Sequence, residues 1–388
     1  MKKIVLLVAL IAGCIVVYPQ ENYKTISRSD STKCYNGSTF YSANTFEQTA
    51  VKKVPRNVIL MIGDGMGISQ ISAALFANQG SLFLNNFRYC GYSQTQSADN
   101  FITDSSAGGT ALSCGERTNN GYVAVDTKKC KLKTILEYAE GKGLKTGLVS
   151  TSSITHATPA SFIAHQESRG SYEDIASDFL KTDIDLFIGG GYKHFTQRAD
   201  GKNLIDSLTA KGYSVFTCLD SLEAKNNGKI ACLTASEHNG RVSERKDMLP
   251  KATRLAVKNL ANGDQGFFLM VEGSQIDMGG HQNDVQYIVE EMLDFDQSIG
   301  EALKFASANK ETLIIVTADH ETGGLALLGG NEKDGQVKAG FATGNHSGVL
   351  VPVFAYGPGA NQFTGIMKNT DIFKKIYALL IDEKLSEN

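Results

Sequence analysis

The sequence lacks three features that would point to particular classes of protein. Its 38 Lys and Arg residues nearly balance its 41 Asp and Glu residues without forming long basic runs, which disfavours nucleic-acid recognition. None of its 7 cysteines forms a Cys-x-x-Cys pair, so a zinc site built from thiolates is not expected. The apolar run near the start of the chain, residues 4–12, is too short to cross a bilayer.

The first residues have the pattern of an export signal. Met1-Lys2-Lys3 supplies the positive charge, and the apolar run of residues 4–12 supplies the hydrophobic region. Residues 11–14 (Ile-Ala-Gly-Cys) resemble a bacterial lipobox, in which Cys14 is lipidated, while a chance cysteine in an ordinary cleaved signal is the alternative. We therefore predict an export signal over residues 1–14 and a protein that is periplasmic or lipid-anchored to a bacterial membrane. A lipid on Cys14 would be its only link to a membrane.

An exported chain meets an oxidising compartment, where disulfides are allowed. Removing Cys14 leaves an even number of cysteines, at positions 34, 90, 114, 130, 218 and 232. Cys218 and Cys232 are the pair best spaced to close a loop, and a buried free thiol is the alternative for each cysteine.

A chain of 388 residues with 42% hydrophobic content can bury one large core. Residues 15–53 are rich in Ser, Thr, Asn and Tyr without a sustained period, which predicts a poorly ordered tether. We expect residues 54–388 to form one catalytic domain. Within it, residues 193–251 are polar and predict a peripheral region without catalytic residues.

Apolar runs without polar interruption predict strands that are buried on both faces, as in a parallel sheet covered by helices. Such runs occupy residues 58–62, 146–149, 186–188, 267–271, 312–317 and 351–356. Helical patterns occupy residues 68–75 and 290–305 and the segment from residue 371. The predicted fold is α/β, with a predominantly parallel central sheet sandwiched by helices.

Acidic residues and histidines follow three of these runs. They are Asp64 after the first; Glu272, Asp277 and His281 after residues 267–271; and Asp319 and His320 after residues 312–317. Taken singly, such a carboxylate could leave the core for solvent or cap a helix. Together they fall at the carboxyl edge of one sheet, where ligands bind. Like charges in a partly desolvated cleft repel unless cations neutralise them, so the pattern predicts metal ions, and His346 in a Gly-rich loop is a further candidate ligand. His165, His194 and His238 lack acidic neighbours of this kind and are interpreted as ordinary surface or core residues.

Two further residues are candidates for phosphate chemistry. Ser105 lies in a run of small residues that opens a predicted helix, where the helix dipole would stabilise an alkoxide or a phosphate; N-capping is the alternative use of such a serine. Arg169 could bind a phosphate with its planar fork, or could be only a surface charge.

The motifs taken jointly resemble those of the alkaline phosphatase family. The resemblance runs from about residue 54 to the C-terminal helix and includes Gly-Asp-Gly-Met-Gly (63–67), Thr-Asp-Ser-Ser-Ala (103–107), Thr-His-Ala-Thr-Pro (155–159) with the later Ser168-Arg169, Val-Glu-Gly-Ser-Gln-Ile-Asp (271–277) with His281, Thr-Ala-Asp-His (317–320) and Asn-His-Ser-Gly (345–348). The family's chemistry implies hydrolysis of small phosphate monoesters at alkaline pH, through a phosphoserine on Ser105 with Arg169 as the phosphate clamp.

The resemblance also implies two zinc ions and one magnesium ion. One zinc would be held by Asp277, His281 and His346, the other by Asp64, Asp319 and His320, and magnesium by Asp64, Thr158 and Glu272. Asp104, His156 and Met278 are expected beside these ligands. His156 stands where some relatives have Asp, and Met278 where Lys or His is common, so metal preference and pH optimum are open.

Only 25 residues separate His320 from His346, where larger relatives insert a surface domain that helps dimers form. We expect no such domain here, and a homodimer remains one assembly to consider. Alternatives within the superfamily are a phosphodiesterase or a related phosphoryl or sulfuryl hydrolase, although Ser105 is not followed by the Pro and Arg that a sulfatase needs. A non-enzymatic exported protein that binds zinc or phosphate ranks lower, because it explains the ligands but not Ser105 with Arg169.

Overall fold

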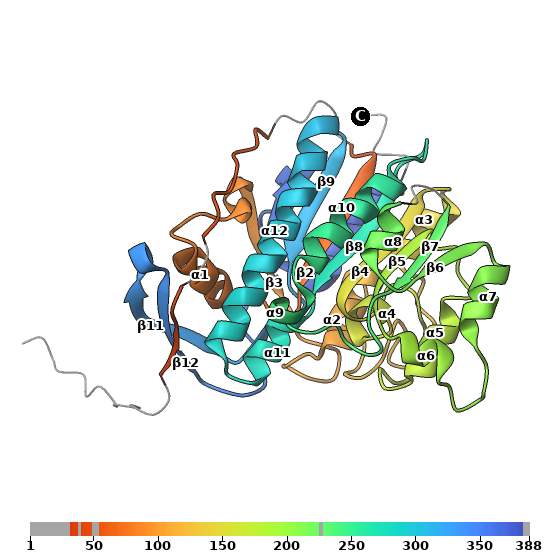
Figure 1. The fold of residues 1–388 in the computed structure, drawn as a ribbon, viewed down its shortest axis with the longest axis horizontal. Coiled ribbons are helices and arrows are strands. Elements are labelled where there is room, and N and C mark those ends of the chain that lie inside the picture. The colour runs from red at the N-terminus through yellow and green to blue at the C-terminus, as the bar shows by residue number, and fades with distance from the viewer. Residues whose placement is uncertain (1–31, 38–39, 49–53, 225–227, 383–388) are drawn as a thin grey trace, which may run out of the picture.

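The computed structural model describes residues 32–37, 40–48, 54–224 and 228–382. Its centre is a sheet of ten strands (Figure 1). In spatial order these are β15 (Gly365–Lys368), β3 (Tyr89–Gln94), β14 (Val351–Tyr356), β9 (Thr312–Thr317), β2 (Asn57–Gly63), β8 (Phe267–Gly273), β4 (Lys145–Ser153), β5 (Leu186–Gly190), β7 (Lys229–Leu233) and β6 (Tyr213–Phe216).

The sheet is predominantly parallel, which confirms the predicted fold class. Within it only β14 is reversed, pairing antiparallel with β9 and with β3, whereas the other neighbouring strands pair parallel. The predicted strand at residues 351–356 is therefore present but runs opposite to its neighbours. Its direction does not follow from an apolar run, since such a run is the same in either orientation.

Helices cover both faces of the sheet, and each face has its own apolar core. In β2, Ile59 and Met61 point into one core while Val58, Leu60 and Ile62 point into the other, as the two-residue period of a strand requires. The first core receives α1 (Ile68–Ala77), α8 (Leu219–Glu223), α10 (Met248–Leu260) and α12 (Val285–Asn309). The second receives α2 (Ser105–Cys114), α3 (Ile135–Gly141), α4 (Ala157–Ala160), α5 (Tyr172–Asp178), α6 (Tyr192–Thr196), α7 (Leu204–Ala210) and α13 (Asn369–Leu380).

Smaller elements complete the chain. Helices α9 (Val242–Arg245) and α11 (Gln275–His281) flank α12, and three short 3-10 helices occupy Phe83–Asn86, Glu332–Asp334 and Ala360–Gln362. Strands β10 (Glu321–Thr322) and β13 (His346–Ser347) pair with each other. A sheet of three strands contains β1 (Lys33–Tyr35), β12 (Gln336–Phe341) and β11 (Leu325–Asn331) in that order. The segment between His320 and His346 therefore holds short strands and one 3-10 turn, and the prediction that no large domain is inserted there is confirmed.

The interpretation of residues 15–53 as a poorly ordered tether is wrong for the part that the structure describes. Strand β1 pairs antiparallel with β12, and the Tyr41 hydroxyl donates to Asp296 Oδ2 of α12 at 2.6 Å. The Tyr41 ring also stacks on Phe83, with centroids 5.8 Å apart. These are tertiary contacts. They could not be predicted from the sequence, because the segment has no hydrophobic periodicity of a helix or a strand.

Residues 193–251 are also more central than predicted. Their strand β7 extends the main sheet by pairing parallel with β5, and β6 pairs parallel with β7 at the edge of the sheet. The segment reads as polar because its strands are short and lie at one side of the sheet.

The predicted export signal and lipobox lie outside the described residues. Within the described ranges, no helix combines the length and apolar character needed to cross a membrane. The six cysteines after Cys14 are all free in the structure, and the spacing of Cys218 and Cys232 does not correspond to a disulfide there. The alternative of a buried free thiol is observed for Cys114 and Cys232, whereas the other four are exposed.

Candidate active site

The strand register brings the predicted acidic residues to one edge of the sheet. Ile62 of β2 lies opposite Glu272 of β8 on one side and opposite Thr317 of β9 on the other. Asp64 and Asp319 each follow two residues after these positions, so both lie beside Glu272 just past the strand ends. The three carboxylates are almost fully buried, with exposed fractions of 0–1%.

Ser105 is the first residue of α2, but it does not cap the helix. The cap is Asp104, whose Oδ1 accepts from the backbone N–H of Ala107 at 2.9 Å. The Ser105 hydroxyl instead lies 3.2 Å from Nε2 of His320, in a buried position. The N-cap of α2 is therefore Asp104 and not Ser105. The Ser105 hydroxyl faces the acidic cluster from the N-terminus of this ten-residue helix.

The guanidinium of Arg169 is held in place rather than free on the surface. Its Nη1 donates to Asp104 Oδ2 at 2.9 Å, and its Nη2 lies 3.3 Å from Nε2 of His156. Burial acts to lower the pKa of Arg169, but the adjacent Asp104 carboxylate outweighs burial and raises it. The cation is thus fixed beside the helix that begins with Ser105, by the residue that also caps this helix.

Asp277, His281 and His346 converge on one point. The Nε2 atoms of both histidines lie near Asp277 Oδ1, at 3.4 and 3.5 Å, and 3.1 Å from each other. Their Nδ1 atoms each face a carbonyl oxygen at 2.8 Å, that of Gly344 for His281 and that of Thr103 for His346. A carbonyl only accepts, so each Nδ1 carries a proton and each Nε2 is left as a donor atom for a metal ion.

Asp64, Asp319 and His320 form a second group. His320 Nε2 lies 3.4 Å from Asp64 Oδ1 and 3.2 Å from Asp319 Oδ2. Burial lowers the pKa of His320 well below its usual value, so its ring is neutral and suited to metal binding. Gly65 lets the turn after β2 lie close to Asp277, because it has a φ of +74° and a Cβ there would lie 2.7 Å from the Cα of Asp277.

A third group surrounds Glu272. Thr158 Oγ1 lies 3.5 Å from Asp64 Oδ2, and the Ser150 hydroxyl donates to Glu272 Oε2 at 2.6 Å. Asp64, His156 and Glu272 also offer ligand atoms that lie within 4.8 Å of one another. The predicted residues Asp64, Thr158 and Glu272 are thus neighbours, with His156 added to them.

The donor set fits divalent cations. Asp64 Oδ1, Asp319 Oδ2 and Glu272 Oε1 are buried and accept no hydrogen bond. Burial, followed by the neighbouring carboxylates, raises the pKa values of Asp64 and Asp319 well above the usual range. Buried carboxylates that are close together and lack donors are expected where cations neutralise them. Histidines suit zinc in the first two groups, and the oxygen-rich third group suits magnesium.

Several supporting residues were not singled out from the sequence. The Thr322 hydroxyl donates to Asp277 Oδ1, and Ser274 Oγ lies 2.9 Å from the Ser150 hydroxyl that contacts Glu272. Ser150 opens a polar run at the end of a predicted strand, which is the signal by which the carboxylates were found. Thr322 carries no such signal, because it reaches the site through the short β10–β13 pairing.

His238, which we expect from the sequence to be an ordinary surface or core residue, lies close to the site. Its ring packs edge-on against His156 with centroids 5.1 Å apart. Its Nδ1 accepts from the backbone N–H of Ser153 at 3.1 Å. His238 therefore supports the ring of His156, which contacts Arg169. This role could not be predicted because His238 is far from His156 in the sequence.

Met278 lies on α11 directly after Asp277. Its sulfur is 3.8 Å from the hydroxyl of Tyr287, which also donates to Gln275 Oε1 at 2.6 Å. Met278 thus contacts α12 at the margin of the site.

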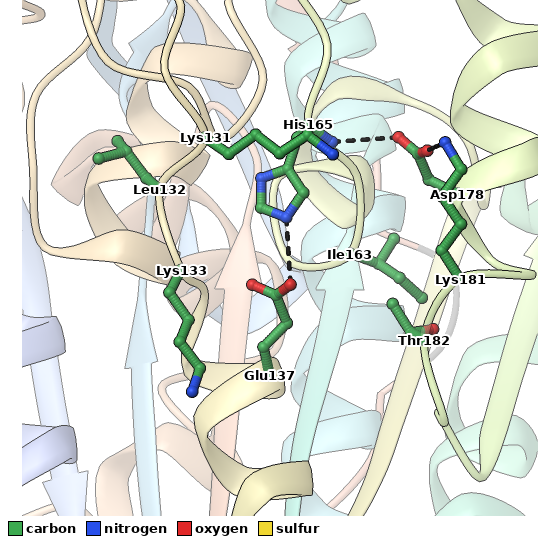
Figure 2. Close-up of a pocket in the computed structure, with 9 residues that line it drawn as sticks. All are labelled: Lys131, Leu132, Lys133, Glu137, Ile163, His165, Asp178, Lys181 and Thr182. Atoms are coloured by element: carbon green, nitrogen blue, oxygen red, sulfur yellow. Dashed lines mark hydrogen bonds and ion pairs between the residues drawn. The ribbon is translucent and has the colours of Figure 1, made fainter.

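A separate cavity of about 320 Å³ is lined by nine residues, none of them a predicted site residue (Figure 2). His165 lies in its wall, with Nδ1 2.9 Å from the Ala124 carbonyl and Nε2 3.2 Å from Glu137 Oε1. This pairing gives His165 a structural role, in keeping with its interpretation as an ordinary residue.

Comparisons with known proteins agree with this geometry. The alkaline phosphatase family matches residues 55–336. Alkaline phosphatase 3 of Bacillus subtilis is 33% identical, covering 84% of this chain and 89% of the relative, and the Escherichia coli alkaline phosphatase is 30% identical, covering 84% and 86%. The structure of alkaline phosphatase from the Antarctic bacterium TAB5 is similar, with a TM-score of 0.80, 41% identity and coverage of 87% and 99%. The chain belongs to the alkaline phosphatase family and is an enzyme of that family.

Proposed function

We propose that this enzyme hydrolyses phosphate monoesters through a phosphoserine intermediate on Ser105. The observation that carries the proposal is the position of the Ser105 hydroxyl. It is free of capping, lies 3.2 Å from His320 Nε2 and stands at the N-terminus of the helix whose cap, Asp104, also holds Arg169. An activated hydroxyl beside a fixed guanidinium is what phosphoryl transfer to serine requires.

The residues present support two zinc sites and one magnesium site. We assign one zinc to Asp277, His281 and His346, the other to Asp64, Asp319 and His320, and magnesium to Asp64, Thr158 and Glu272. When bound, these ions would lower the pKa values of the serine hydroxyl and of water and would neutralise charge on the oxygens of the phosphoryl group.

The chain's own residues then act in two displacements. Ser105 Oγ attacks phosphorus as its proton passes to solvent, the Oγ–P bond forms, the ester P–O bond breaks, and the departing alcohol takes up a proton from solvent. Arg169 and the N–H groups of α2 bind the equatorial oxygens of the phosphoryl group in both steps. Water attacks next, breaking the Oγ–P bond and releasing inorganic phosphate, with the Ser105 hydroxyl restored. Both steps need a deprotonated oxygen nucleophile, so the rate should rise into the alkaline range.

The test is hydrolysis of an aryl phosphate monoester at alkaline pH, before and after chelation and with zinc and magnesium restored. The proposal requires activity that chelation abolishes, that the two ions restore and that Ser105→Ala lacks. Activity indifferent to chelation would refute it. An aryl phosphate diester in the same assay separates monoesterase from diesterase activity, since a diesterase would prefer the second substrate.

We also propose that the enzyme is exported by the signal and lipobox in residues 1–14, with a lipidated Cys14 as the first residue of the mature chain, and that it forms a homodimer. Labelling with a fatty-acid analogue should disappear in Cys14→Ser, and persistence of the label would reject the lipobox. Sedimentation equilibrium should give twice the chain mass, and a single chain mass would reject the dimer.

A further inference from the structure

We infer that the cavity beside Arg169 binds a planar ring of the substrate's alcohol group, so that the enzyme selects phosphate monoesters of ring-bearing alcohols. This inference rests on the proposed function, because the wall of the cavity begins at Gly170, the residue after Arg169, and we assign Arg169 to the phosphate. The cavity measures about 540 Å³, and its wall includes Gly170, Tyr172, His194 and Gln197. This is room for an organic group of the size of a nucleoside or an aryl alcohol.

The cavity is joined to the phosphate clamp through two segments of chain. Gly170 directly follows Arg169, and the backbone N–H of Tyr172 donates to the Gly170 carbonyl at 2.9 Å, which turns the chain tightly after the clamp. His194, which also lines the cavity, contacts Thr155, the residue before His156, whose Nε2 lies 3.3 Å from Arg169 Nη2. An alcohol group on a phosphate held by Arg169 would therefore have this cavity next to it.

An aromatic surface is fixed in the wall. The rings of Tyr172 and His194 stack with centroids 4.8 Å apart and planes 5° apart. His194 is buried, with an exposed fraction of 8%, and its Nδ1 lies 2.6 Å from Thr155 Oγ1. Because His194 covers one face of the half-buried Tyr172, the other face is what Tyr172 can offer to the cavity. A preorganised ring face stacks with planar rings at little entropic cost.

The charged residues in the wall of the cavity indicate a ligand less clearly than the Tyr172 ring does. Lys193 in its wall forms an ion pair with Glu237. The Glu173 carboxylate accepts from the backbone N–H of Ala199, at 3.0 Å to each oxygen. These two charges are thus engaged within the protein, while the exposed carboxylate of Asp174 in the same wall disfavours an anionic ligand. A planar group that stacks on Tyr172 therefore fits the cavity better than a second anionic group does.

The experiment compares substrates that leave through similar alcohols but differ in a planar ring. Adenosine 5′-monophosphate is paired with ribose 5-phosphate, and 2-phenylethyl phosphate with 2-cyclohexylethyl phosphate. For each pair the ratio of kcat/KM is measured in the metal-loaded enzyme, in Tyr172→Ala, in Tyr172→Phe and in a control, Tyr92→Ala. Tyr92 is 40% exposed on β3 and does not line the cavity.

We expect the wild-type enzyme to prefer the planar member of at least one pair, and Tyr172→Ala to reduce that preference about tenfold. Tyr172→Phe should keep the preference, since it keeps the ring, and Tyr92→Ala should keep it as well. The ratio does not depend on how much of a variant is folded, so partial unfolding cannot imitate the result. A response confined to the first pair identifies nucleoside esters, and one confined to the second pair identifies aryl-bearing alcohols.

Two results would overturn the inference, and both differ from failure of the proposed function. A wild-type ratio near one for both pairs, or an unchanged preference in Tyr172→Ala, removes the stacking site while hydrolysis continues. If the wild-type enzyme hydrolyses none of the four esters, the proposed function itself is wrong.

Discussion

The Nε2 atoms of His281 and His346 lie 3.1 Å apart, and both lie near the same oxygen of Asp277. Each ring is oriented by a carbonyl at its Nδ1, so two donor atoms and a carboxylate face one point. The hydrogen bond with Asp277 raises the pKa of His281 to about 9, which shows how strongly this carboxylate favours a positive charge beside it.

Replacing one of these ligands should release zinc. We predict that His346→Ala weakens zinc binding by more than about tenfold and lowers phosphatase activity, because only two ligands of its group remain. Metal content after dialysis against a weak chelator measures the effect. His165→Gln is the matched control, since His165 pairs with Glu137 away from the ligand groups, and its zinc content should equal that of the wild type. Equal zinc retention in His346→Ala would contradict the assignment.

Asp104 should have two separable roles, one in the helix and one in the site. Asp104→Ala removes the cap of α2 and should lower the free energy of unfolding by about 1 kcal/mol. Asp104→Asn keeps an N-cap oxygen for Ala107 but replaces the oxygen that accepts from Arg169 Nη1 and from the backbone N–H of Gly121, so it should destabilise less than Asp104→Ala while KM rises. Thermal unfolding and steady-state kinetics on the two variants test this. A KM in Asp104→Asn equal to that of the wild type would show that Asp104 does not hold the clamp.

The His165–Glu137 pair should stabilise the fold over a limited pH range. Burial opposes the charge on both groups, but their contact raises the pKa of His165 above 6.5 and lowers the pKa of Glu137 below 4.5. The contribution of His165 is complete below pH 6.5 and is lost as pH rises through its raised pKa. The contribution of Glu137 is complete above pH 4.5 and is lost as pH falls through its lowered pKa.

The pair is therefore fully present between about pH 4.5 and 6.5. Unfolding of wild type and His165→Gln should differ most in this window, by on the order of 1 kcal/mol for a partly buried pair, and the difference should shrink above pH 7. Denaturant midpoints measured across pH test it. A difference that grows with rising pH would show that His165 is not charged in the folded state.

Most of the fold could be predicted, because the strands that build it can be recognised in the sequence as apolar runs. The predicted strand at residues 312–317 has the bounds of β9, and the carboxylates after three strands meet because parallel strands share one carboxyl edge. What sequence did not predict depends on contacts between distant segments. Tyr41 reaches Asp296, and His238 packs on His156, without a local period or motif that would mark either residue.

The central claim is that Ser105 carries the phosphoryl group during turnover. The direct measurement is mass spectrometry of the metal-loaded enzyme, quenched in acid during hydrolysis of a phosphate monoester. We predict a peptide containing Ser105 that has gained the mass of one phosphoryl group, and its absence in Ser105→Ala together with loss of activity. Steady hydrolysis without a phosphorylated Ser105 peptide, at an undiminished rate in Ser105→Ala, would contradict the account.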